Sequence, residues 1–158
     1  KARILSEGTD IALLSAGICT EEAMRATAVL RRRGVSIEHL HISTHKPFDD
    51  PSVRAALTKV SRGVITLENH TVVGGLGSAV AEVMAEIGCQ NKLIRLGLPD
   101  TYAHGASRPY LMREYGLDAL ALVGAFEKLL QISFGLAEAD LAGVRLEAVH
   151  SEAKAEAL

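Results

Sequence analysis

One stretch, residues 64–80, limits the fold of this chain more than any other. It opens with an apolar run, Val64–Leu67, and passes through a polar segment into a glycine-rich turn, Gly74–Ser78. Apolar residues then recur at helical spacing: Leu76, Val80, Val83, Met84 and Ile87. A strand, a glycine turn and an amphipathic helix in this order form the unit from which parallel α/β sheets are built.

The rest of the chain repeats this alternation of extended and helical patterns. Strands are expected at residues 3–6, 11–15, 36–42, 64–67 and 92–98, and helices at 20–33, 51–62, 76–87, 108–115 and 118–130. Glycine or proline punctuates most of the junctions. The pattern therefore predicts an α/β fold with three layers, in which a mainly parallel sheet lies between helices.

Polar residues mark where three of the helices begin. Thr20 is expected to cap the first helix, because two acidic residues follow it in the first turn. Asp50 and Pro51 are a favoured pair for the N-cap and the first helical position. Asp118 is the expected cap of the helix at 118–130.

The pattern weakens after Ser133. Leu141, Val144 and Ala148 indicate one more helix, and the stretch from Glu152 is expected to fray. We therefore divide the chain into an α/β domain at 1–130 and a C-terminal helical extension at 131–158.

Composition restricts the class of protein. The net charge is −2 and 48% of the residues are hydrophobic, with no long basic block, so the sequence does not favour nucleic acid or an anionic membrane as a partner. No apolar run is long enough to span a bilayer. The two cysteines, Cys19 and Cys89, have no metal spacing, which favours a reducing, cytoplasmic location. Because the chain begins at Lys1, we interpret it as a piece of something longer.

The turn Gly74–Ser78 is the first candidate for a binding site. Amides at the start of a helix can hold an anion such as phosphate. However, the turn matches neither GxGxxG nor a P-loop, and a polar segment separates it from the strand. Anion binding therefore stays open beside close helix–sheet packing and a protein interface.

The histidines and Cys19 are the other candidates for chemistry. His39 and His41 share one face of a strand, but no third ligand is placed near them, so no metal site is expected. His70 follows a strand end, where α/β sites gather, and a structural or interface role is favoured over catalysis. His104 is expected to order its polar loop. A helix start can lower the pKa of a thiol such as Cys19, but no base is placed beside it, so the sequence gives only weak support for a nucleophile.

Four motifs in a fixed order resemble the C-terminal domain of the transketolase family. The resemblance covers roughly residues 3–130 and is shared with deoxyxylulose-phosphate synthase and the β subunits of 2-oxo-acid dehydrogenases. It is closest to the synthase and to bacterial transketolase-like chains encoded as two halves. The motifs are Glu7–Gly17 (EGTDIALLSAG), His45–Asp49 (HKPFD), Glu68–His70 with Gly74–Ser78 (ENH and GGLGS), and Gly97–Asp100 (GLPD).

The resemblance implies a five-stranded mixed sheet whose first strand is antiparallel to the others. It also implies that thiamine diphosphate and Mg²⁺ are held by two other domains, the pyrimidine- and diphosphate-binding domains. Their marks, a GDG metal motif and an activating glutamate, are not recognisable here. No catalytic, cofactor-binding or metal-binding residue is therefore expected in this chain, which we expect to be inactive by itself.

The resemblance implies an assembly role within an enzyme that transfers two-carbon ketol units between sugar phosphates as a homodimer. The residues that match the family's loops are expected at an interface or at an anion site: Glu68, His70, Gly74, Gly75, Gly77, Ser78, Asp100 and His104. Two alternatives remain open. One is the same domain in a deoxyxylulose-phosphate-synthase-type enzyme, and the other is a stand-alone module for phosphate-ligand binding or dimerisation.

Overall fold

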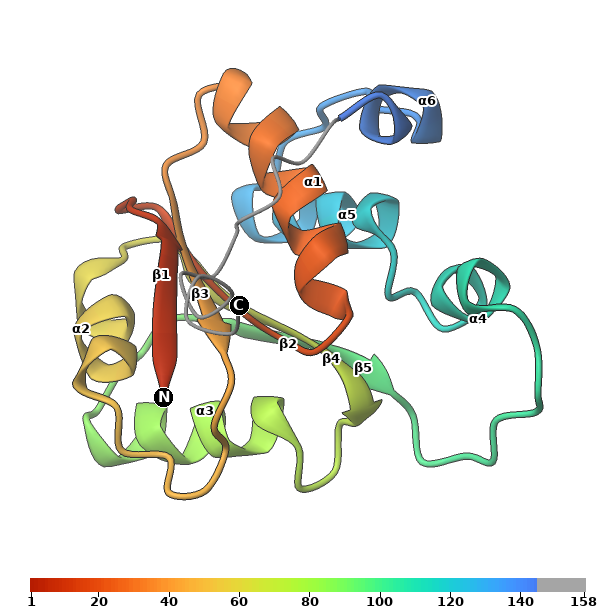
Figure 1. Cartoon of the computed structure of the whole chain (residues 1–158). Helices are drawn as coiled ribbons and strands as arrows, with labels where there is room; N and C mark the ends of the chain where they lie inside the picture. The colour runs from red at the N-terminus through yellow and green to blue at the C-terminus, as the bar shows by residue number, and fades with distance from the viewer. Residues whose placement is uncertain (145–158) are drawn as a thin grey trace, which may run out of the picture.

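The fold alternates strands and helices along the chain, as a computed structural model that describes residues 1–144 shows. The strands are β1 (Ala2–Ser6), β2 (Ile11–Ala16), β3 (Ile37–Ile42), β4 (Gly63–Thr71) and β5 (Leu93–Leu98). The helices are α1 (Cys19–Arg32), α2 (Pro51–Lys59), α3 (Leu76–Glu86), α4 (Arg108–Glu114), α5 (Ala119–Leu130) and α6 (Glu138–Ala142). Figure 1 shows the sheet between two groups of helices.

The strands form one five-stranded sheet in the order β1-β3-β2-β4-β5. Strand β1 runs antiparallel to β3, and the other neighbouring pairs are parallel. The expected mixed sheet with an antiparallel first strand is therefore confirmed. Because β1 and β5 are the outer strands, each has one sheet neighbour in the described part of the chain.

Two apolar cores lie on opposite faces of this sheet. Helices α1 and α5 cover one face, and α2 and α3 cover the other (Figure 1). Strand β2 is buried on both faces: Ile11 and Leu13 enter the first core, Ala12 and Leu14 enter the second, and Ser15 is its one polar residue. A central strand buried on both faces has no side that favours polar residues.

Two of the three expected helix caps are confirmed. The Asp50 carboxylate accepts a hydrogen bond from the Ser52 amide at 3.0 Å. Asp118 accepts one from the Ala121 amide at 2.8 Å. The prediction for Thr20 is wrong, because α1 begins at Cys19 and its N-cap residue is Ile18, without a side-chain cap.

The boundaries of two elements differ from the prediction. Strand β4 does not end near Leu67 but continues to Thr71, which pairs with Leu98 after an irregularity in the register. Helix α2 ends at Lys59, and Gly63 belongs to β4 instead of stopping the helix. The last residues of β4 are polar, so the apolar pattern ends before the strand does. Strand pairing at this end depends on the neighbouring β5 and not on an apolar pattern.

The expected helix after Ser133 is present as the short α6, in which Leu141 is buried. Val144 follows it, while Ala148 and the stretch from Glu152 lie outside the described residues. Within residues 1–144, no helix is both long and apolar enough to cross a membrane.

Candidate functional site

The C-terminal ends of the strands bring several of the predicted residues to one edge of the sheet. A cavity of about 350 Å³ opens there beside the end of β4 and the start of α3. It is lined by Ala16, His45, Glu68, Asn69, His70, Gly74, Gly75, Leu76 and Ala79. Ala16 and His45 come from segments that the sequence did not connect to this turn.

Glu68 is the centre of this arrangement. Its side chain is 2% exposed, and its carboxylate accepts hydrogen bonds from the amides of Leu76 at 2.6 Å and Gly77 at 2.9 Å. These amides belong to the first turn of α3, where backbone donors lack helical partners and the helix dipole favours negative charge. The chain therefore supplies its own anion to this helix start.

The remaining turn residues are held by local contacts and close packing. The Gly74 amide donates to Ser78 Oγ at 3.0 Å, and this hydroxyl donates to the Val72 carbonyl at 3.0 Å. A Cβ atom on Gly77 would lie 2.9 Å from Thr66 Oγ1 and 2.7 Å from Arg95 Cδ. The glycine thus allows α3 to approach the sheet closely.

His70 is on the surface at the end of β4. Its Nδ1 lies 3.1 Å from the carbonyl oxygen of Thr71, a distance that fits an Nδ1–H donor. Glu68, two residues earlier in the chain, faces the start of α3, whereas His70 is exposed. The two side chains therefore do not form an acid–base pair.

Asp100 and His104 belong to a second, separate surface. Every residue from Pro99 to Tyr110 is exposed. His104 Nε2 lies 3.9 Å from a Glu114 carboxylate oxygen, and its ring meets Tyr110 edge-on at a centroid distance of 6.1 Å. His104 thus contacts α4, and no hydrogen bond within the described residues joins it to Asp100.

A second cavity, of about 290 Å³, lies between the end of β5 and α4 and was missed by the sequence reasoning. It is lined mainly by apolar groups: Ile18, Asn69, Leu98, Ala103, Ala106, Arg108, Leu111, Met112, Tyr115 and Leu117. The one feature of the sequence that could have indicated this cavity is Ile18, an apolar residue between a glycine and the start of α1. Its side chain is 43% exposed.

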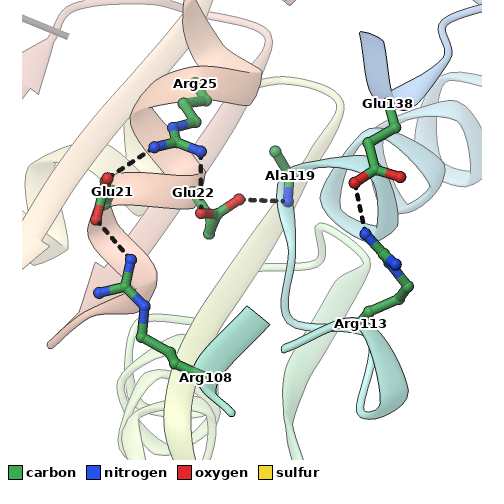
Figure 2. A network of polar contacts seen from close by, with 7 residues as sticks. All are labelled: Glu21, Glu22, Arg25, Arg108, Arg113, Ala119 and Glu138. Carbon is green, nitrogen blue, oxygen red and sulfur yellow. Dashed lines mark hydrogen bonds and ion pairs between the residues drawn. The ribbon is translucent and has the colours of Figure 1, made fainter. Parts of the chain in front are cut away.

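Charged contacts attach the helices around this second cavity to α1. Arg108 pairs with Glu21 at 3.2 Å, and the Glu22 carboxylate accepts a hydrogen bond from the Ala119 amide at 3.0 Å. Figure 2 shows these contacts together with the ion pair between Arg113 and Glu138. The acidic first turn of α1 therefore positions α4 and the start of α5.

His39 and His41 belong to a chain of side-chain hydrogen bonds. Ser15 Oγ lies 2.8 Å from His39 Nε2 and donates to Thr20 Oγ1 at 3.0 Å. Thr20 Oγ1 in turn lies 2.8 Å from His41 Nδ1. Burial, together with the neighbouring His41, lowers the pKa of His39 to about 3, so this ring is neutral.

The lowered pKa that a helix start allows is not found at Cys19. Burial raises the pKa of this thiol to about 12, and the negative charges of Glu22 and Glu68 act in the same direction. The side chain is fully buried. The helix start does not offset these effects, because two carboxylates already lie near the sulfur.

The buried acids of the described residues do not fit a metal–diphosphate site. Glu68 is bound by two amides of α3, and Glu38 accepts hydrogen bonds from the Gly8 amide at 2.7 Å and from Lys59 Nζ at 2.9 Å. Within residues 1–144, no group of three or more acidic, histidine or cysteine side chains is placed to hold a metal ion. The two buried carboxylates are therefore already engaged within the domain.

Comparisons with known proteins agree with this fold. The family described as "Transketolase, C-terminal domain" matches residues 1–122. A putative transketolase C-terminal section of Methanocaldococcus jannaschii is 37% identical over 118 residues, which are 75% of this chain and 36% of that protein. A 6-deoxy-6-sulfo-D-fructose transketolase subunit of Clostridium sp. is 37% identical over 83% of this chain and 40% of that subunit.

A synthase and a solved structure extend the comparison. The 1-deoxy-D-xylulose-5-phosphate synthase of Chlorobium phaeovibrioides is 36% identical over 77% of this chain, but the match covers 19% of the synthase. A structure described as a split-gene transketolase, inactive beta4 tetramer, has a TM-score of 0.73 and 31% identity, covering 84% of this chain and 42% of that one. The chain thus spans about two fifths or less of these relatives.

Proposed function

This chain belongs to the transketolase C-terminal domain family, and from that premise we propose that it is the C-terminal section of a thiamine-diphosphate-dependent transketolase. The whole enzyme would transfer two-carbon ketol units between sugar phosphates. This section would contribute assembly and not catalytic groups. We propose that it works in the cytoplasm, which its two unpaired cysteines support.

The geometry of Glu68 carries the proposal of an assembly role. The buried carboxylate at the sheet edge is bound by the Leu76 and Gly77 amides, so it is not free to move a proton. His70 is exposed at the end of β4 beside this turn, whereas Asp100 and His104 are exposed on the separate loop that follows β5. Exposed polar side chains next to a turn whose amides already have partners are suited to contact with another protein surface.

We propose that the pyrimidine- and diphosphate-binding domains lie on another part of the same chain or on a separate chain. Those domains would hold thiamine diphosphate and Mg²⁺, and the cofactor would supply the carbanion chemistry of ketol transfer. The support is that the relatives include a C-terminal section and a subunit, and that this chain spans 36–42% of them. The whole assembly would be a homodimer of the complete enzyme.

Similarity to synthases supports a second candidate of the same class. Several deoxyxylulose-phosphate synthases are 32–36% identical to this chain over about four fifths of its length. In that case the complete enzyme would condense pyruvate with a triose phosphate. This chain would have the same assembly role in either enzyme, because the reacting groups lie in the other domains.

Reconstitution with the cofactor-binding section from the same genome tests the proposal. The two sections are purified separately and mixed with thiamine diphosphate and Mg²⁺. Ketol transfer is measured with a ketose phosphate donor and an aldose phosphate acceptor, and condensation is measured with pyruvate and a triose phosphate. We expect activity only in the mixture, and the active substrate pair decides between the two candidates.

Single-residue variants connect the reconstituted activity to the proposed surface. His70→Ala and His104→Ala, both at exposed positions, should weaken the complex and raise the amount of this section needed for half-maximal activity. Lys128→Ala, an exposed residue on α5, is the matched control. Activity of this chain alone, or a cofactor-binding section that is equally active without it, would contradict the assembly role.

A further inference from the structure

The outer edge of β5 offers unpaired backbone groups. In the described part of the chain β5 has a single neighbour, β4. The amide of Val64 in β4 donates to the carbonyl of Lys92, just before β5, and the amide of Val72, just after β4, donates to the carbonyl of Leu98. In a parallel ladder alternate residues bond to the same neighbour. The amides and carbonyls of the intervening residues, Leu93, Arg95 and Gly97, therefore point away from β4.

The two outer strands differ in the regularity of their pairing. Strand β1 has a register irregularity between Ile4 and Ser6, and such irregularities are one means by which proteins blunt a sheet edge. By contrast, β5 has six residues, no internal proline and regular pairing at its residues 93–96. Each strand carries one exposed arginine, Arg3 in β1 and Arg95 in β5.

We propose that β5 pairs antiparallel with β5 of a second copy of this chain, around a two-fold axis at Leu96. The two sheets would then form one continuous sheet across the dimer. This interface goes beyond the proposed function, which concerns contact with the cofactor-binding domains.

The side chains select one register of this pairing. With Leu96 opposite its own copy, Ile94 lies opposite Leu98, and these half-buried residues form a single apolar row on one face. On the other face Arg95 lies opposite Gly97, which has no side chain to oppose it. A shift by one residue in each strand would place Arg95 opposite Arg95, and facing like charges disfavour that register.

Charges at the two ends of the strand complement each other in the same register. Lys92 of one copy lies opposite Asp100 of the other, and the two-fold axis repeats this pair. Both side chains are exposed and neither has an ion pair in the described residues. Opposite charges across strands favour the pairing and help to define its register.

Disulfide trapping tests the position of the two-fold axis. In a Cys89→Ser background, Leu96→Cys places two thiols opposite each other at a non-hydrogen-bonded position, with Cα atoms about 4.5 Å apart, a distance that a disulfide spans. Ile94→Cys is the matched control, since it is on the same face but opposite Leu98. We expect mild oxidation to yield a covalent dimer for Leu96→Cys and for the double variant Ile94→Cys/Leu98→Cys, but not for Ile94→Cys alone.

Charge reversal tests the pairing without altering the core. Sedimentation equilibrium of the 158-residue chain should show a dimer whose dissociation constant rises about tenfold in Lys92→Glu and in Asp100→Lys, and returns in the double variant. Equal trapping of Leu96→Cys and Ile94→Cys would overturn the proposal. A monomeric chain would also overturn it. The same holds if Lys92→Glu leaves self-association unchanged and weakens only binding to the cofactor-binding section. The unmodified chain could still restore activity to the cofactor-binding section if it is a monomer, so failure of the β5 pairing is distinguishable from failure of the proposed function.

Discussion

The Oε2 atom of Glu68 lies 2.6 Å from the amide nitrogen of Leu76. This hydrogen bond joins the end of β4 to the first turn of α3. The other carboxylate oxygen accepts from Gly77 at 2.9 Å. One buried side chain thus neutralises a helix start for which the sequence alone left anion binding open. The amides at this helix start therefore have a structural partner within the domain.

Glu68→Gln should destabilise the protein. The amide group of glutamine would direct an N–H donor at a backbone donor of α3, which leaves a buried group unsatisfied. We expect a loss of roughly 1–3 kcal/mol in the free energy of unfolding, measured by urea denaturation. Glu82→Gln, on the exposed side of the same helix, is the control and should change stability by less than about 0.5 kcal/mol.

Inorganic phosphate should not stabilise the unmodified chain. Glu68 already accepts from the two amides that a phosphate would need. In Glu68→Ala these donors become free, and millimolar phosphate should raise the melting temperature of that variant by mass action. A rise of equal size in the unmodified chain would show that the anion displaces the carboxylate, and would favour the ligand-binding alternative.

Stability should fall as the solution becomes acidic, because of His39. Its pKa is about 3 in the folded protein and 6.5 in an unfolded chain, since burial disfavours the charged ring. The unfolded state therefore binds a proton between these values while the folded state does not. The stabilisation is fully present above the unfolded pKa and is lost as the pH falls below it.

Urea denaturation across this range measures the effect. Between about pH 7 and about pH 5 we expect His39 to account for roughly 1–2 kcal/mol of lost stability. In His39→Gln this part of the pH dependence should disappear, although the variant is less stable throughout. His104→Gln, in the exposed loop, should retain the full slope, and an unchanged slope in His39→Gln would refute the assignment.

Two glycine-to-alanine substitutions should change the stability of the protein in opposite directions. Gly77→Ala places a methyl group 2.9 Å from the buried Thr66 Oγ1 and should cost about 1–3 kcal/mol. Gly124→Ala, inside α5, meets no atom within 4 Å and should stabilise by about 0.5–1 kcal/mol through helix propensity. Thermal unfolding of both variants checks this, and a neutral Gly77→Ala would show that α3 can move away from the sheet.

The two thiols should differ in reactivity toward alkylating reagents. Cys19 is fully buried and its pKa is raised to about 12, whereas Cys89 is half-buried. At mildly alkaline pH we expect one labelled thiol in the native protein and two after denaturation, counted by intact mass. Cys89→Ser should abolish native labelling, and rapid labelling of Cys19 in that variant would contradict its burial.

The sequence alone determined the architecture of the domain. Apolar runs bounded by glycine and proline, as at Ile11–Ser15 and Val64–Leu67, predicted the central strands, and Asp50 and Asp118 marked two helix starts. These signals are local, because a buried strand or a capped helix requires its own residue types. The resemblance added the antiparallel first strand, which no periodicity in residues 3–6 indicates.

Only the tertiary structure decided what the candidate residues do. Glu68 and Leu76 are eight residues apart, and no sequence spacing shows that the carboxylate turns back onto the helix start. In the same way, Thr20 is bound by Ser15 and His41 instead of capping a helix, and Cys19 lies beside Glu22 and Glu68. Partners of polar side chains are chosen by which strands become neighbours, and that choice is made by the packing of the whole sheet.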